Sequence, residues 1–146
     1  MAQTNPMNAS ISFQGNVACG GSASLILKDD GTCIFHGSFH DSGLVPYGVA
    51  FAMVVHTDTG KAFSFVKTGN VNGTAEVLAD PTRSRDFTWD DTTQSPAVKA
   101  AWPDITKGFD FHWKADVNVD AVGLLKDVVG IVQKIVPIAG QVISII

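Results

Sequence analysis

The segment FDFHWKADVNVD, residues 109–120, alternates strictly between apolar and polar side chains. Successive side chains of an extended chain point to opposite sides, so the apolar members share one face and the charged and histidine members share the other. The apolar members are Phe109, Phe111, Trp113, Ala115, Val117 and Val119. This pattern predicts a β-strand that covers a hydrophobic core with one face.

Similar period-two patterns precede it, separated by glycine-containing turns. Residues 22–28 and 32–40 flank the turn Asp29-Asp30-Gly31, which predicts a β-hairpin with Cys33 opposite Leu27. Cys19 would then lie about four residues away along the ladder, roughly 13 Å, which is too far for a disulfide. We therefore expect both cysteines to be buried as small apolar side chains.

Two further strands complete the first part of the chain. Residues 47–56 form a continuous apolar run, as in a strand covered on both faces, and residues 61–67 alternate again after a turn. We predict a mainly β fold, an antiparallel sheet or β-sandwich, over residues 1–120, with an irregular loop at 79–104 and a short helix at 95–102 inside that loop.

Residues 121–146 change to a helical period. At about 100° per residue their apolar side chains sweep an arc of roughly 220°, much wider than the roughly 100° stripe of an ordinary surface helix. Asn118 or Asp120 is suited to cap the helix, and residues 141–146 are alternatively a strand. The pattern predicts a C-terminal amphipathic α-helix with a contact surface. The expected contact residues are Leu124, Leu125, Val128, Ile131, Val132, Ile135 and Val142.

Three partners fit this helix: its own sheet, other copies of the chain, or a lipid membrane. A spanning helix is not expected, because charged residues up to Lys134 leave only 135–146 uncharged, short of the roughly 20 residues needed. A helix lying in the membrane interface fits the apolar arc, and Pro137 provides a hinge. The helix lacks the cationic face that attracts anionic lipid.

The region 79–104 carries aromatic and acidic side chains together. Aromatic faces beside carboxylates can stack on sugar rings and accept hydroxyl hydrogen bonds, so a glycan is a further candidate ligand. The alternative is that the aromatics close the end of the sheet structure. We expect Trp89 to be the more exposed tryptophan and Trp102 to face the core. The residues of this candidate site are Trp89, Trp102, Asp86 and Asp90.

Composition excludes some classes of partner. The chain has 146 residues and a net charge of −4, and its ten Lys and Arg residues are scattered, so no basic stripe predicts nucleic-acid binding. Residues 1–6 show neither the charged nor the apolar region of a secretory signal peptide. We therefore expect synthesis in the cytoplasm, with release by a non-classical route left open.

No catalytic or metal motif is recognisable. The neighbours His40, Asp41 and Ser42 point apart on a strand, so they cannot form a hydrolase triad. His36 and His40 share a face but stand about 13 Å apart, too far for one ion. His56 and His112 would meet only through a strand register that the sequence does not determine. We therefore expect no enzyme activity, no cofactor and no metal.

The turns and strands at 31–43 and 69–74, together with His112-Trp113 ahead of the apolar C-terminal segment, resemble a family of small uncharacterised bacterial β-rich proteins. This resemblance implies a shared fold and no known activity. From the residues themselves, we expect a non-enzymatic, membrane-interacting protein of toxin or effector type acting through its C-terminal helix. The alternatives are a self-assembling structural protein joined by that helix and a carbohydrate-binding β-sandwich.

Overall fold

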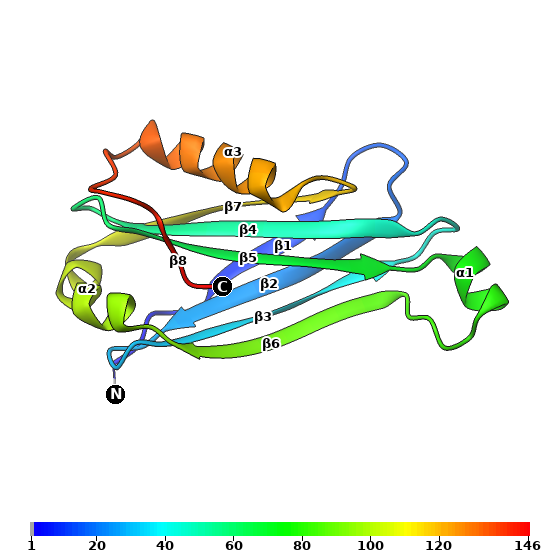
Figure 1. The fold of residues 1–146 in the computed structure, drawn as a ribbon, viewed down its shortest axis with the longest axis horizontal. Helices are drawn as coiled ribbons and strands as arrows, with labels where there is room; N and C mark the ends of the chain where they lie inside the picture. Colours follow the sequence, from blue (N-terminus) through cyan, green and yellow to red (C-terminus); the bar gives the residue numbers. More distant parts are fainter. Residues whose placement is uncertain (1) are drawn as a thin grey trace.

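A computed structural model describes residues 2–146 and contains two four-stranded sheets (Figure 1). The first sheet has the order β1-β2-β3-β6, and the second has the order β7-β4-β5-β8. The strands of the first are β1 (Met7–Ser12), β2 (Cys19–Leu27), β3 (Thr32–Asp41) and β6 (Asp86–Gln94). Those of the second are β7 (Phe109–Val117), β4 (Tyr47–Thr57), β5 (Ala62–Val71) and β8 (Ile143–Ser144). All pairings are antiparallel except that of β5 with β8, so the prediction of a mainly β fold with a C-terminal helix is confirmed.

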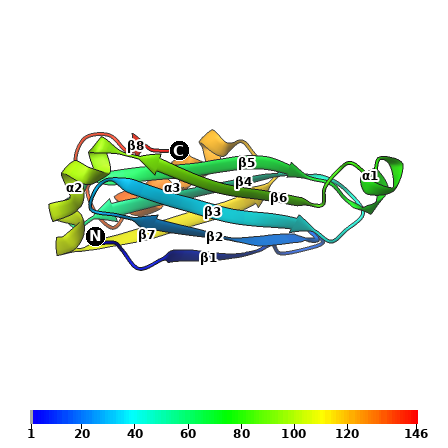
Figure 2. The ribbon, with the colours of Figure 1, turned by 90° about the horizontal axis from the view of Figure 1, so that it is seen from below.

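The inner faces of the two sheets share one hydrophobic core. At its centre, Phe35 of β3 lies 5.9 Å from Phe51 of β4 and 5.4 Å from Trp89 of β6, measured between ring centroids. The apolar residues of β7, from Phe109 to Val117, pack against the same core with the face that their alternation indicated. Figure 2 shows the two layers running along the long axis of the molecule.

The β2–β3 hairpin has the expected register, with Leu27 paired to Cys33. Its turn requires glycine at position 31, because the φ of +89° there would strain the backbone of any residue that has a Cβ. Cys19 and Cys33 are both buried and unpaired, as predicted. Burial raises the pKa of each thiol to about 11, with the Asp41 carboxylate adding to the rise at Cys19, so neither is an activated nucleophile.

The expectation of an irregular loop at 79–104 is wrong for most of that range. Residues 86–94 form β6, whose even-numbered side chains face solvent while its odd-numbered side chains face the other sheet. Helix α2 (Pro96–Lys107) follows directly and continues past the expected end at residue 102. Its start is as predicted, because the Ser95 side chain accepts a hydrogen bond from the Val98 amide and proline occupies the first turn.

Two helices lie at opposite ends of the molecule and a third covers a sheet face (Figure 1). Helix α1 (Thr74–Ala79) projects at the end where β5 finishes, and α2 closes the other end. Helix α3 (Ala121–Gln133) lies across the outer face of the second sheet. The Asp120 side chain caps it by accepting a hydrogen bond from the Val122 amide at 3.1 Å, which confirms one of the two expected caps.

Candidate functional site

The face of the second sheet beneath α3 is made of small side chains. Outward-facing Ala50, Ala52 and Val54 alternate along β4 with inward-facing Phe51, Met53 and Val55. Three residues of α3 pack on this floor at a spacing of four, which is one stripe of a helix. They are Leu124, Val128 and Val132, all buried. The sheet therefore covers only the middle of the apolar arc.

The other expected contact residues lie at the flanks of that stripe or beyond the helix. Leu125, Ile131 and Val142 are half-buried, and Ile135 is 57% exposed. Val122, in the first turn of α3, is 60% exposed. The positions farthest from the sheet hold Gly123, Lys126, Gly130 and Gln133. Within residues 121–146, the exposed apolar surface thus lies on the flanks of α3 and on residues 134–146.

The helix is shorter than expected, because it ends at Gln133 instead of continuing to Ile146. Proline at 137 has no N–H to continue helical hydrogen bonding, and Gly140 adopts φ +78°. The chain then crosses the β4–β5 turn, where the Ala139 amide donates to the Gly60 carbonyl at 2.7 Å. Residues 143–144 pair with β5 as β8, so part of the alternative strand at 141–146 is present.

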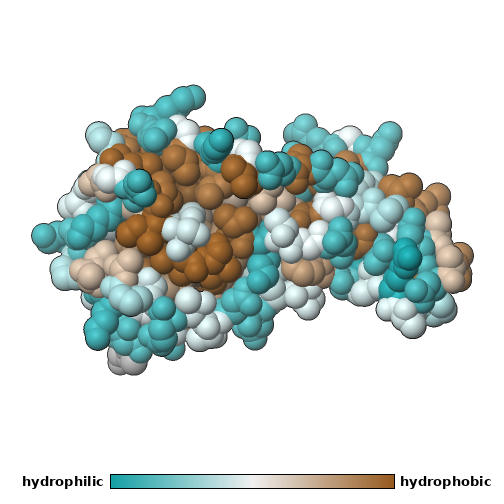
Figure 3. Space-filling view, in the orientation of Figure 1, coloured by the Kyte–Doolittle hydropathy of each residue, from teal (hydrophilic) through white to brown (hydrophobic). Residues whose placement is uncertain are grey.

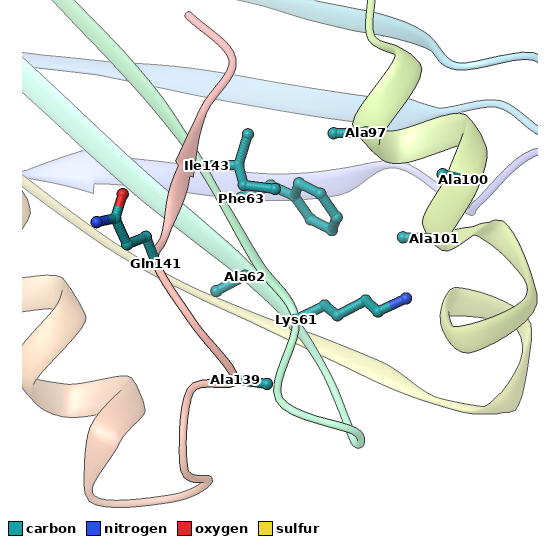
Figure 4. Close-up of a pocket in the computed structure, with 9 residues that line it drawn as sticks. All are labelled: Lys61, Ala62, Phe63, Ala97, Ala100, Ala101, Ala139, Gln141 and Ile143. Carbon is teal, nitrogen blue, oxygen red and sulfur yellow. The ribbon is translucent and has the colours of Figure 1, made fainter.

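Residues 134–146 and α2 border an open apolar pocket of about 290 Å³ (Figure 4). Phe63 of β5, Ala97 and Ala101 of α2, and Ile143 of β8 line it. At its rim, Lys61 reaches toward α2, where its ammonium group contacts the Asp104 carboxylate at 2.6 Å. We name the surface formed by this pocket, residues 134–146 and the exposed flanks of α3 the C-terminal apolar surface. In Figure 3 a large apolar patch occupies this side of the molecule.

The structure places the other predicted site differently from our expectation. Trp89 is only 6% exposed and packs among aromatic rings of both sheets, whereas Trp102 is half-buried, so the expected order of exposure is wrong. Trp89 points inward because it shares the inward-facing parity of β6, while Asp86 and Asp90 face solvent. Trp89 therefore offers no open face to a sugar ring.

One cluster was not recognised from the sequence. His56 of β4 and Asp110 and His112 of β7 lie together on the outward face of the second sheet. The alternation of β7 placed Asp110 and His112 on one face, but nothing local in the sequence aligned that face with His56.

Within residues 2–146, no helix is both long enough and apolar enough to cross a membrane. Comparison with known protein families, with curated proteins and with solved structures found no match for this chain. The resemblance noted in its turns and strands therefore receives no support from these comparisons.

Proposed function

We propose that this is a non-enzymatic, membrane-interacting protein of effector type that contacts lipid through its C-terminal apolar surface. The observation that carries the proposal is the exposure of this surface. Ile135 and Ile143 are 57% and 43% exposed, and from Val128 to Ile146 the only charged side chain is Lys134. Large apolar patches of this kind on a protein surface are typical of interaction sites.

The docking of α3 supports the same proposal. Its three buried side chains pack on alanine and valine, so the apolar sheet surface that the helix covers is made of small side chains. Each buried aliphatic side chain contributes about 1.5–3 kcal/mol, and the hydrocarbon boundary of a bilayer offers α3 a comparably apolar environment. Transfer of the amphipathic helix from sheet to bilayer therefore has a small net apolar cost.

The test is flotation of the full-length protein with phosphatidylcholine vesicles, with and without phosphatidylglycerol. We expect the wild-type protein to float with the vesicles and the double variant Val122→Glu/Ile135→Glu to remain unbound. Each apolar side chain that no longer enters the bilayer costs about 1.5–3 kcal/mol, so replacing two of them reduces partitioning by at least about 100-fold. Both positions are exposed, so the variant keeps the folded core.

The matched control is Leu44→Glu/Leu78→Glu, which changes exposed leucines, 69% and 78% accessible, at the α1 end of the molecule. This variant should float like the wild type. Failure of the wild-type protein to bind either kind of vesicle would refute the proposal. If only Leu44→Glu/Leu78→Glu failed to bind, the lipid contact would lie at the α1 end instead of the C-terminal apolar surface.

Self-association through the same surface is the second candidate, because an exposed apolar surface also fits another copy of itself. Light scattering without lipid separates the two. The membrane proposal expects the 15.4 kDa monomer. A larger mass that Val122→Glu/Ile135→Glu reduces to the monomer would favour assembly.

A further inference from the structure

His56 is a buried polar residue without a partner. It is 3% exposed, and neither of its ring nitrogens has a hydrogen-bond partner among residues 2–146. Most buried polar side chains in folded proteins are hydrogen-bonded, so an unsatisfied imidazole points to a ligand or another special role. It follows Val54 on the outward face of β4, toward the end of the strand that adjoins the β4–β5 turn.

The register of β4 with β7 brings two more potential ligands to the same place. His56 pairs with Asp110, and Val54 pairs with His112, so all three side chains share one face of the sheet. The imidazole rings of His56 and His112 are stacked, with centroids 5.4 Å apart and planes 9° from parallel. One ligand atom from each of the three residues lies within 4.8 Å of the other two.

The side chains of His56, Asp110 and His112 do not hydrogen-bond to one another. The Nε2 atom of His112 is buried without a hydrogen-bond partner, and it lies 3.8 Å from Asp110 Oδ2, beyond hydrogen-bond distance. The Asp110 Oδ1 atom accepts from the Phe111 amide, which leaves Oδ2 available. In its neutral form, the imidazole of His56 has a lone pair on one of its two ring nitrogens, and that atom can bind a metal ion.

We propose that His56, Asp110 and His112 bind a divalent transition-metal ion, of which zinc is the best match. Two imidazole nitrogens with one carboxylate oxygen form a ligand set typical of zinc, whereas magnesium and calcium prefer oxygen ligands throughout.

Only small movements close the site. Ligand atoms around a tetrahedral zinc are about 3.4 Å apart, so the ligand-atom spacings must shorten by at most about 1.4 Å and the parallel rings must tilt toward a common point. Rotation about the terminal torsions supplies this, because those of His and Asp are broad. The Asp110 side chain is 65% exposed, so the ion has a route from solvent and a fourth position for water.

The test is zinc titration of the metal-free full-length protein by calorimetry, together with the visible spectrum of the cobalt-loaded protein. We expect one zinc ion per chain and cobalt bands of a four- or five-coordinate ion. His112→Ala and Asp110→Asn change partly exposed side chains, so they preserve the fold, which far-ultraviolet circular dichroism checks. We expect His112→Ala to weaken binding by more than about 100-fold, since even removal of a residue that only orients a ligand costs about 10- to 100-fold.

The chain provides a matched control in the exposed pair of His40 and Asp86, which are 2.7 Å apart on the other sheet. His40→Ala should leave the affinity and the cobalt spectrum unchanged. The proposal is overturned if the wild-type protein binds no zinc, if folded His112→Ala and Asp110→Asn bind as tightly as the wild type, or if His40→Ala removes the binding.

Discussion

Two glycines in the core leave room for aromatic side chains of β6. A Cβ added to Gly37 of β3 would lie 2.5 Å from the Trp89 ring and 2.5 Å from the Ser22 carbonyl oxygen. Gly69 of β5 is covered in the same way by the Phe87 ring. In both places an aromatic side chain of β6 occupies the space over a glycine, Trp89 over Gly37 within the first sheet and Phe87 over Gly69 between the two sheets.

Gly37→Ala should therefore destabilise the protein by at least about 1–3 kcal/mol, because overpacking in a filled core forces strain on its neighbours. Chemical denaturation measures the change. Gly123→Ala introduces the same methyl group where nothing lies within 4 Å and serves as the control. Equal stability of Gly37→Ala and the wild-type protein would contradict the packing described for Trp89.

At the scale of elements, two glycines weaken helix α3. Its Gly123 and Gly130 make no contact that a methyl group would disturb, yet each lowers helix stability. Conversion of either glycine to alanine should raise the free energy of unfolding by roughly 0.5–1 kcal/mol, which thermal denaturation detects.

Gly140→Ala is the informative comparison for these two variants. Its surroundings are equally open, but its φ of +78° disfavours a side chain, so this change should destabilise the protein. If Gly140→Ala raised stability, the positive φ of Gly140 would be contradicted. If Gly123→Ala and Gly130→Ala lowered stability, the helical backbone or the open surroundings of these two residues would be contradicted.

The elements also show what local pattern can and cannot predict. The β2–β3 register, the alternation of β7 and the Ser95 cap of α2 depend on neighbouring residues, and the sequence predicted them. For α3 the sequence offered both Asn118 and Asp120 as caps, and the structure shows Asp120. Strand β6 also alternates, but its many acidic residues are typical of a loop, and the sequence alone did not reveal them as the solvent-facing side chains of an edge strand. The cluster of His56, Asp110 and His112 depends on the pairing of strands more than fifty residues apart, which no local signal determines.

At the scale of the whole molecule, one ion pair among residues 2–146 joins the two sheets. Lys67 of β5 contacts Asp91 of β6, and the two side chains are 25% and 32% exposed. Asp91 is an inward-facing charge on the edge strand β6, a device that also discourages pairing with other chains.

Asp91→Asn should lower stability by about 1–2 kcal/mol, because it leaves the half-buried lysine without its charged partner. The adjacent Asp90 faces solvent, so Asp90→Asn should change the free energy of unfolding by no more than about 0.5 kcal/mol. Urea denaturation of both variants provides the comparison, and identical effects would mean that the ion pair contributes nothing to the association of the sheets.

The path of the chain between the sheets has a consequence for how the protein folds. The β2–β3 and β4–β5 hairpins form from neighbouring segments, whereas β6 returns to β3 and β7 returns to β4 only after long excursions. Non-local pairings of this kind give a high contact order, for which folding times fall in the range of about milliseconds to seconds. Until β6 and β7 arrive, the edges of β3 and β4 and the rings of Phe35 and Phe51 remain open to other molecules. Aggregation is therefore a hazard for this protein during the interval between synthesis of β3 and pairing of β7.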